Sequence, residues 1–301
     1  CEPYLTCDER TMQEQTEKFV DGVAIVCKIV GAQAIIVLEE NKEYIKPQIL
    51  EEINKKGYAD DISICIVKTK YPQGSEKFIV NAALGIEIPS AKLPADAGTI
   101  ICNVGTVCAI SDAFRLGMPL IERSLTISGG AVENPCNLRV PVGTLVSDLA
   151  PEFYQVKEGE VAKIISGGPM MGFAMPSTAF PIAKGTSGIT FLAKNDTYLG
   201  DEDQCISCGG CVSTCAMRLS PALMIRELKA GNIAKAKRFG LMDCIECGCC
   251  AFVCPAHINI VQRIRLGKGI VRQQMAEERA KAAAAATKAA AAASSENKEA
   301  K

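Results

Sequence analysis

Residues 10–125 alternate between amphipathic stretches and short apolar runs, and each kind recurs several times. The amphipathic stretches have helical periodicity and each closes on a glycine, a common helix stop; they cover residues 11–31, 42–57, 74–85 and 105–117. The apolar runs have the length of buried strands and cover residues 34–40, 62–71 and 98–103. Helices and strands that alternate in this way predict an α/β fold with a Rossmann-like, mostly parallel sheet.

After this region the pattern changes to short β-rich pieces that glycine and proline interrupt. This density of turn residues predicts a small β-grasp-type module at residues 124–195, which leaves residues 1–123 as the α/β domain. A segment that combines cysteine runs with helix formers follows at residues 196–268 and predicts an α-helical domain. Residues 269–301 are rich in Ala and Lys but lack apolar periodicity, so we expect a disordered tail.

Composition and charge narrow the possible partners. The chain has 301 residues, of which 48% are hydrophobic, enough for ordinary cores in two or three domains. Its net charge of −1 shows no basic excess, so we expect no nucleic-acid partner and no polybasic membrane patch. No apolar run reaches the roughly 18 to 20 residues that a membrane-spanning helix needs.

Eight of the sixteen cysteines fall into two runs with the same spacing, C-x2-C-x2-C-x3-C. This is the spacing of bacterial two-cluster ferredoxins, in which three close thiolates hold one [4Fe-4S] cluster and the fourth ligates the other cluster. Gly209 and Gly248 let the backbone approach each cluster closely. We therefore expect two crossed ligand sets, which are Cys205, Cys208, Cys211 and Cys254 for one cluster and Cys244, Cys247, Cys250 and Cys215 for the other.

All-cysteine zinc sites are the alternative, since paired C-x2-C units also bind zinc. The third cysteine of each run and the crossed fourth ligand favour iron-sulfur clusters. Cys249 is a fifth thiol in the second run, and we expect it to point away from the cluster. With a protein thiolate on every iron there is no open position for a substrate, so the runs indicate electron transfer.

Four further segments carry a resemblance to a known family: "CEPYLTCDERTM", "YPQGSEKFIVNAALG", "LPADAGTIICNVGTVCAI" and "GGAVENPCNLRVPVGT". Together with the cysteine runs they resemble the C subunit of the Rnf ion-translocating electron-transport complex, from Cys1 to about Gly269. That family is similar to the flavin subunit of respiratory complex I, which binds FMN and NADH. The resemblance therefore implies an FMN and NADH site in the α/β domain.

The resemblance also implies which residues contact the cofactors. "CEP" at the start matches the end of the family's "ECEP" segment, which places Glu2 near the flavin and the nicotinamide. "YPQGSEK" resembles "Y-x-x-G-E-E" of the flavin subunits and "CNVGT" resembles "NNVET"; the positions implied are Tyr71, Gly74, Ser75, Glu76, Asn103 and Thr106. Ser75 replaces an acidic residue of the family pattern, and Cys102 and Gly105 also depart from it.

The residues themselves support part of this assignment. Asn103 and Thr106 lie where a predicted strand gives way to a helix, and the free amides of a helix N-terminus favour a phosphate. An ordinary N-cap and first turn are an equally concrete interpretation of the same two residues.

The implied function is that of a peripheral subunit that oxidises NADH, or reduces NAD, through FMN and passes single electrons through two [4Fe-4S] clusters. The resemblance implies other subunits of an ion-translocating membrane complex as partners, an indirect link to ferredoxin, and a place on the cytoplasmic face of the inner membrane. Two alternatives stay open: a cobalamin-reductase-like flavoprotein with the same domain order, and a non-enzymatic ferredoxin-like carrier. In the family a glycine-rich loop that wraps the FMN phosphate precedes the "ECEP" segment. We therefore expect a truncated N-terminus and a chain that keeps its clusters but binds FMN and NADH weakly or not at all.

Overall fold

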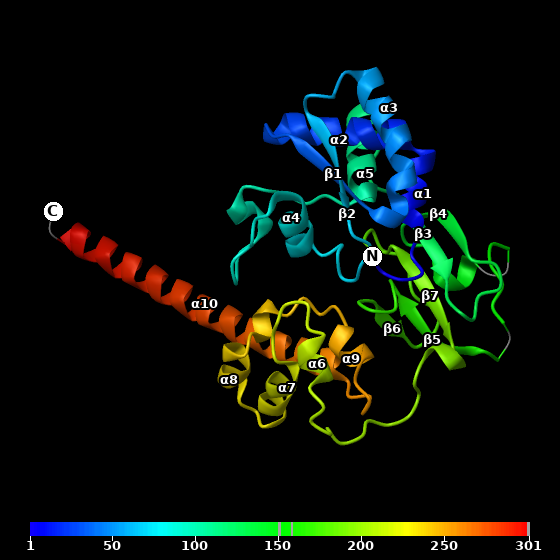
Figure 1. The fold of residues 1–301 in the computed structure, drawn as a ribbon. Helices are drawn as coiled ribbons and strands as arrows, with labels where there is room; N and C mark the ends of the chain where they lie inside the picture. The colour runs from blue at the N-terminus through cyan, green and yellow to red at the C-terminus, as the bar shows by residue number, and fades with distance from the viewer. Residues whose placement is uncertain (150–151, 158, 300–301) are drawn as a thin grey trace. The chain divides into compact units, whose positions relative to one another are not determined.

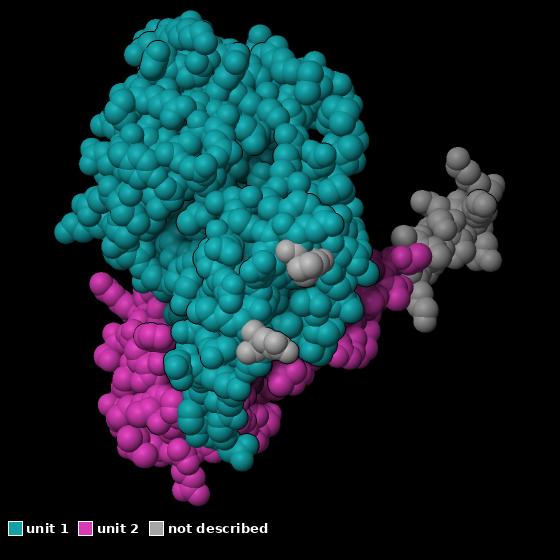
Figure 2. Space-filling model, turned by 90° about the vertical axis from the view of Figure 1, so that its right-hand side faces the viewer, with its two compact units in different colours: residues 1–201 teal, residues 202–301 magenta. Residues whose placement is uncertain are grey.

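The computed structural model describes residues 1–149, 152–157 and 159–299 (Figure 1). The chain forms two compact units, Cys1–Asp201 and Glu202–Lys301, which Figure 2 colours separately. The first unit has two hydrophobic cores, one built from residues of the α/β part and one from residues of the β-rich part. No helix within the described ranges is both long enough and apolar enough to span a bilayer.

The α/β part contains the helices and strands that the pattern predicts up to residue 85, and the helix after residue 103. Its elements are α1 (Cys7–Glu14), α2 (Thr16–Val30), β1 (Ala34–Glu39), η1 (Glu40–Ile45), α3 (Lys46–Lys56), β2 (Ile62–Val67), α4 (Glu76–Leu84), η2 (Pro94–Ala97) and α5 (Val104–Leu116). β1 and β2 pair in parallel, with Ala34 opposite Ile62, so the predicted parallel pairing is confirmed. The predicted glycine stops are also confirmed, because left-handed glycines end four helices: Gly31, Gly57, Gly85 and Gly117.

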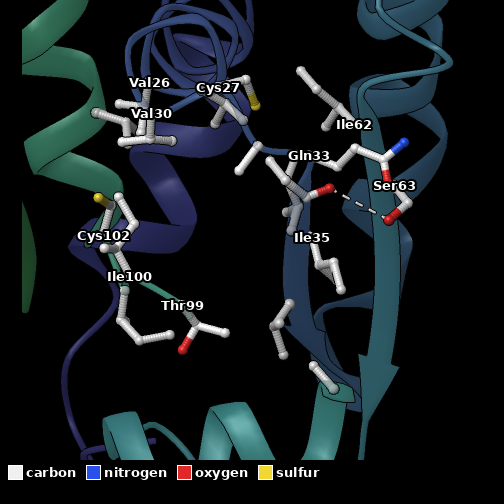
Figure 3. Close-up of a pocket in the computed structure, with 18 of the residues that line it drawn as sticks. Val26, Cys27, Val30, Gln33, Ile35, Ile62, Ser63, Thr99, Ile100 and Cys102 are labelled. Atoms are coloured by element: carbon white, nitrogen blue, oxygen red, sulfur yellow. Dashed lines mark hydrogen bonds between the residues drawn. The ribbon is translucent and has the colours of Figure 1, made fainter. Parts of the chain in front are cut away.

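The predicted strand at residues 98–103 is wrong, and the parallel sheet has two strands among the described residues. A cavity of about 720 Å³ lies between this segment and β1, with Thr99, Ile100 and Cys102 on one side and Ile35 on the other (Figure 3). Strands must lie about 4.8 Å apart to form ladder hydrogen bonds. The apolar side chains of the segment therefore line the cavity, and its backbone stays outside the sheet.

Helices α2 and α5 lie in close contact at Gly22. A Cβ atom on Gly22 would come within 2.0 Å of the Val107 carbonyl oxygen, so only glycine allows this approach. The core beside this contact is formed by side chains of α2, α3, α5 and the sheet, among them Val20, Ile49 and Ile36.

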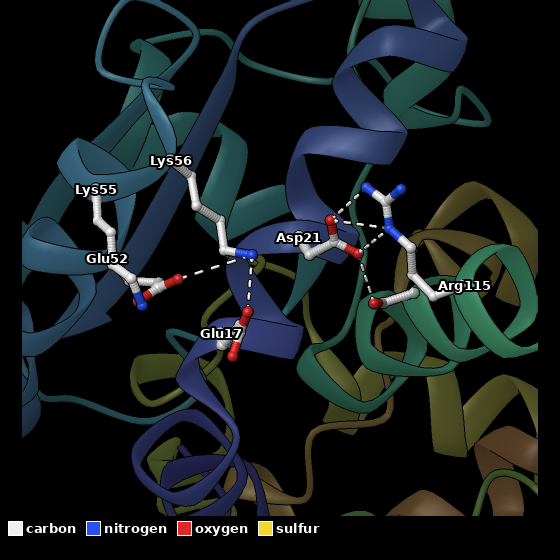
Figure 4. A network of polar contacts seen from close by, with 7 residues as sticks. Glu17, Asp21, Glu52, Lys55, Lys56 and Arg115 are labelled. Atoms are coloured by element: carbon white, nitrogen blue, oxygen red, sulfur yellow. Dashed lines mark hydrogen bonds and ion pairs between the residues drawn. The ribbon is translucent and has the colours of Figure 1, made fainter.

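A polar network joins the same helices at their surface (Figure 4). Asp21 of α2 accepts hydrogen bonds from the Arg115 guanidinium and the Ser111 hydroxyl of α5, the shortest from Arg115 Nη2 at 2.6 Å. Lys56 of α3 pairs with Glu17 of α2 at 3.1 Å. The hydrogen bonds from Arg115 lower the pKa of the Asp21 carboxyl below the usual aspartate range.

The β-rich part of the first unit has the predicted β-grasp arrangement. Its strands are β3 (Glu122–Ser128), β4 (Cys136–Pro141), β5 (Val161–Ser166), β6 (Phe173–Met175) and β7 (Gly188–Ala193), with short helices η3 (Val146–Leu149) and η4 (Lys194–Asp196). The sheet order is β4-β3-β7-β5-β6, and the first and last strands, β3 and β7, lie side by side and parallel in its middle. All six residues of β7 are buried, and Phe191 meets Tyr154 with ring centroids 5.4 Å apart.

The second unit is helical, as predicted. It contains α6 (Gly210–Ser213), α7 (Pro221–Lys229), α8 (Ile233–Arg238), η5 (Leu241–Asp243), α9 (Cys249–Phe252) and α10 (Ile260–Glu299). Its core includes Met224, Leu241 and Ile264, and Cys250 lies in the same cluster.

The structure differs from the expected disordered tail, because α10 continues through residues 269–299. The side chains of Ile264 and Val271, in the first turns of this helix, are buried in the core. The helix is therefore already nucleated before the Ala-rich stretch begins. Alanine and lysine are good helix formers, and each added residue then extends an existing helix. Residues 300–301 lie outside the described residues.

We expect Gly22→Ala to lower the free energy of unfolding by about 2 kcal/mol, because the added methyl group forces α2 and α5 apart. Urea unfolding followed by circular dichroism measures this difference. Gly269→Ala is the matched control: it is also helical, has nothing within 4 Å of the added Cβ, and is expected to gain up to about 1 kcal/mol. A Gly22→Ala protein as stable as the wild type would contradict the close contact.

We expect Asp21→Asn to cost about 1 kcal/mol of stability at neutral pH, a modest value because Arg115 is largely exposed. The folded state lowers the pKa of Asp21, so its stabilisation is present above the ordinary aspartate pKa and is lost as the pH falls through the lowered value. The difference between wild type and variant should therefore shrink below about pH 4 in urea unfolding series. Glu122→Gln, which breaks an exposed pair with Arg139, should show a smaller difference; a constant Asp21→Asn difference down to the lowest pH would refute the linkage.

Candidate functional site

The two cysteine runs form turns with the same backbone geometry, repeated after 39 residues from Cys205 to Cys244. The residue directly before the second cysteine has a positive φ in both runs, 57° at Ser207 and 58° at Glu246. The glycine after the second cysteine is also left-handed in both runs. The backbone of both turns therefore curves in the same way. This curvature suits three thiolates that bind one iron-sulfur cluster from different sides.

Backbone amides point at two of the ligand sulfurs. The Leu219 amide donates to Cys215 Sγ at 3.3 Å, and the Glu246 amide donates to Cys244 Sγ at 3.4 Å. Hydrogen bonds of this kind stabilise a thiolate, the form that binds iron.

The fourth cysteine of each run is close enough to the other run to act on it electrostatically. Burial raises the pKa of the Cys250 thiol, and Cys244, Cys247 and Cys215 raise it further. Burial likewise raises the pKa of Cys211, with further contributions from Cys208 and Cys254. The crossed ligand sets stay a prediction.

A site for a single metal ion needs four sulfur atoms close to one another. Four thiolates around one zinc ion, at 2.3 Å each, lie about 3.8 Å from one another. Within the described residues no three His, Cys, Asp or Glu side chains form a group that could hold one metal ion.

Cys249, the fifth thiol of the second run, has Cys247 as a close neighbour. Burial raises the pKa of the Cys249 thiol, and Cys247 and Cys215 raise it further. The fifth thiol therefore stands beside the second ligand set.

The sequence analysis did not predict that a lysine ammonium contacts the second cysteine run. The Lys268 ammonium donates to the Cys244 carbonyl oxygen and to the Glu246 carboxylate, at 2.7 Å for the latter. Arg265 donates to the other oxygen of Glu246 at 3.0 Å. The signal in the sequence was the charged residue inside the cysteine run, where the first run has Ser207.

In the first unit, Glu2 lies against a loop of the β-grasp part. Its carboxylate accepts hydrogen bonds from the amides of Met170, at 3.2 Å, and Met171, at 2.7 Å. Burial raises the pKa of Glu2, while these two amides act in the opposite direction. The loop was not among the predicted site residues, because only the folded chain brings it to Glu2.

The second predicted segment follows the carboxyl end of β2. The Gly74 amide donates to Cys1 Sγ at 3.1 Å, so this segment meets the chain beside Glu2. Ser75 is the N-cap residue of α4, and Glu76 is exposed in its first turn. Tyr71 is partly buried in the loop before them.

Asn103 and Thr106 lie at the N-terminus of α5, and Asn103 acts as its N-cap. Its Oδ1 accepts from the Gly105 amide at 2.9 Å, and its Nδ2 donates to the Asp8 carboxylate at 2.8 Å. The Thr106 amide donates to the Asn103 carbonyl oxygen at 3.0 Å. These amides are therefore already paired, and the helix end presents few free donors to a phosphate.

Two of the predicted cofactor segments meet in the first unit, since the Gly74 amide contacts Cys1, the neighbour of Glu2. The backbone nitrogen of Cys1 lies 3.8 Å from the carboxylate of Glu39, the last residue of β1, and Tyr71 follows the end of β2. Ligands of α/β proteins bind at the carboxyl ends of parallel strands, so the placement suits a nucleotide. The cavity of about 720 Å³ is a different feature, because none of the seven predicted cofactor residues lines it.

The residues fit the two kinds of cofactor to different degrees. The eight cysteines lie in two runs with the same turn geometry, and amides donate to two of their sulfurs, as iron-sulfur clusters need. The predicted flavin segments of Glu2 and Gly74 meet, whereas the amides of Gly105 and Thr106 at the start of α5 are already paired. Redox chemistry is thus supported most strongly in the second unit.

Two family models match separate parts of the chain. Residues 1–112 match the family described as Nuo51 FMN-binding domain. Residues 196–258 match the family described as 4Fe-4S dicluster domain.

Curated relatives match nearly the whole chain, and three of them are C subunits of ion-translocating complexes. The chain is 45% identical over 283 residues to that of the proton-translocating ferredoxin:NAD(+) oxidoreductase complex of Clostridium ljungdahlii, covering 93% of the chain and 61% of that protein. It is 39% identical to that of the Na(+)-translocating ferredoxin:NAD(+) oxidoreductase complex of Acetobacterium woodii, covering 93% and 62%. It is 38% identical to that of the ion-translocating oxidoreductase complex of Rhodobacter capsulatus, covering 92% and 53%. The chain thus spans between half and two thirds of the length of these relatives.

A solved structure shares the fold. A chain of the NAD+-reducing [NiFe]-hydrogenase in the air-oxidized state superposes with a TM-score of 0.53 at 17% identity, covering 78% of this chain and 46% of that chain. At this identity the likeness shows the fold alone.

We expect Gly168→Ala to lower the free energy of unfolding by about 1–3 kcal/mol, since it leaves two amides without their acceptor. A Cβ on Gly168 would lie 2.4 Å from Glu2 Oε2, so the carboxylate must leave the amides of Met170 and Met171. Urea unfolding measures the loss. Gly185→Ala is the control, because nothing lies within 4 Å of its added Cβ; equal stability of the two variants would show that Glu2 is not held by this loop.

Proposed function

Because the chain belongs to the family of C subunits of ion-translocating oxidoreductase complexes, we propose that it transfers electrons between a flavin and two [4Fe-4S] clusters. In this proposal residues 1–112 bind the flavin, and the clusters of the second unit transfer one electron at a time. The reaction class is oxidation of NADH, or reduction of NAD, within a complex of several subunits.

One observation carries the proposal: the two cysteine runs form the same turn. Ser207 and Glu246 have φ angles of 57° and 58°, and a left-handed glycine follows the second cysteine of each run. Amides donate to the sulfurs of Cys215 and Cys244. Two cubes contain eight irons, and eight thiolates give each iron one protein ligand. No coordination position then remains for a substrate, so the chemistry of this unit is electron transfer. The proposed ligand sets are Cys205, Cys208, Cys211 and Cys254, and Cys244, Cys247, Cys250 and Cys215.

The flavin side of the proposal follows from the number of electrons. A hydride from NADH carries two electrons, whereas each cluster accepts one. Bound FMN supplies the conversion between two-electron and one-electron transfer. The protein has to hold and orient the two cofactors, and the proposed contacts are Glu2, Tyr71, Gly74, Ser75, Glu76, Asn103 and Thr106.

Glu2 is the most constrained of these contacts. Its carboxylate is fixed by two amides, and its partial burial excludes part of the surrounding water. Such a carboxylate can orient a polar edge of a bound ring without a change in its own position.

The partners proposed are the other subunits of a membrane complex, with a link to ferredoxin through them. The names of the relatives support this, since they describe ferredoxin:NAD(+) oxidoreductase complexes that translocate protons or sodium ions. A peripheral place on the cytoplasmic face of the membrane is part of the same proposal.

The test is anaerobic reconstitution of the chain, followed by iron and sulfide analysis and EPR spectroscopy. We expect about eight irons per chain and, after reduction with dithionite, the coupled signal of two neighbouring clusters. In a second step FMN is added and then NADH, with the full-length Clostridium ljungdahlii relative treated in parallel. Reduction of the clusters by NADH only when FMN is present would support the flavin side.

The outcomes separate the parts of the proposal. Zinc, or about four irons per chain, would overturn the crossed ligand sets. Eight irons that NADH reduces in neither protein would leave a two-cluster electron carrier. Eight irons that NADH reduces in the relative alone would show that the 301 residues are not sufficient for the flavin reaction.

A further inference from the structure

The second unit is an internal repeat, and its two halves differ in one charged position inside the cysteine runs. A shift of 39 residues carries each cysteine of the first run onto one of the second, from Cys205 and Cys244 onward. The same shift pairs Ser207 with Glu246, and both have the same left-handed backbone conformation. It also pairs two lysines on the helices that follow, Lys229 and Lys268.

In the second half, the lysine is buried against the cysteine run. Lys268 is 5% exposed, and its ammonium donates to the Cys244 carbonyl oxygen and to Glu246. Arg265 contacts the same carboxylate. Two cations therefore share one carboxylate, and one net positive charge remains next to this ligand set.

In the first half, the corresponding charges are arranged differently. Lys229 is exposed at the end of α7. Arg226, which corresponds to Arg265, pairs with its neighbour Glu227 at 3.1 Å. Ser207 carries no charge, and among the described residues of the second unit Lys268 is the one buried cation.

The Lys268 ammonium is held next to the second run by its hydrogen bonds to the Cys244 carbonyl oxygen and the Glu246 carboxylate, both of which belong to that run. Reduction of a cluster adds one negative charge, and a nearby cation favours the more negative state. Because Lys268 is buried, water and salt screen its charge less than they would screen that of Lys229.

Burial of the cysteines has the opposite effect on the second cluster. Cys247 and Cys250 are buried, whereas Cys205 and Cys208 are exposed. A dry environment disfavours the more highly charged, reduced cluster. The buried Lys268 ammonium would offset this penalty for the cluster that Cys247 and Cys250 ligate.

We propose that Lys268, held by Glu246 and Cys244, raises the reduction potential of the cluster ligated by Cys244, Cys247, Cys250 and Cys215, and that the other cluster has no such residue. This inference rests on the proposed function, because it requires two clusters. It makes the two sites chemically different despite their identical cysteine spacing. Lys268 is a tuning residue and ligates no iron.

The experiment is an EPR-monitored redox titration of the reconstituted full chain, wild type and Lys268→Met. We expect the variant to keep about eight irons, as two [4Fe-4S] clusters require, and to lower the midpoint potential of one cluster while the other stays unchanged. Lys268→Arg, which keeps the charge, should return the potential toward the wild-type value. Lys229→Met is the matched control and should shift neither cluster.

A variant of the carboxylate provides an independent readout. Glu246→Gln removes a negative charge and should raise the midpoint potential of the same cluster that Lys268→Met lowers. If Lys268→Met fails to bind a full set of irons, the Glu246→Gln result decides. Eight irons with unchanged potentials in every variant that assembles would overturn the inference, whereas zinc or four irons in the wild type would overturn the proposed function itself.

Discussion

The second unit depends on the conformation of its two cysteine turns. Each turn places a non-glycine residue, Ser207 or Glu246, in the left-handed region, where an L-residue is disfavoured by about 1–2 kcal/mol. The amides of Leu219 and Glu246 also donate to the sulfurs of Cys215 and Cys244. Bonds from four thiolates to each proposed cluster are far stronger than this backbone cost, and binding energy of that kind contributes directly to folding. Cys250 lies in the hydrophobic core and Cys244 packs against it, so assembly of the proposed cluster would be coupled to packing of the unit.

In the proposed ligand sets, the fourth cysteine of each run ties the two turns to each other. Cys215 acts on the pKa of Cys250, and Cys254 acts on that of Cys211. With crossed sets, neither half of the repeat could complete its cluster alone. The halves nevertheless differ in their surroundings, because Glu246 holds a buried lysine and Ser207 does not. An internal repeat thus provides two similar sites, and a single charged position makes them unequal. In the first unit, the β-grasp part also positions a predicted cofactor residue, because the amides of Met170 and Met171 in its loop hold the Glu2 carboxylate.

Local signals in the sequence were sufficient for much of this. The left-handed glycines that end α2 and α3, Gly31 and Gly57, were predictable because they depend on the residue itself. The density of turn residues was enough to predict the β-grasp-type module but not its strand order, and the crossed ligand sets stay a prediction from the cysteine spacing. Contacts between distant segments were not predictable: Glu2 with its loop, and Lys268 with Cys244, 24 residues away. The segment at residues 98–103 has the composition of a strand, but pairing also needs a neighbouring edge at the right distance, and composition carries no such information.

The most direct test of the account is a crystal structure of the anaerobically reconstituted chain, with anomalous diffraction data collected at the iron edge. The account predicts eight iron positions in two groups of four, as two [4Fe-4S] clusters require, with Cys215 bound to the group that Cys244, Cys247 and Cys250 hold, and Cys254 bound to the other. Iron groups ligated entirely within one run, or isolated single-metal peaks, would contradict it.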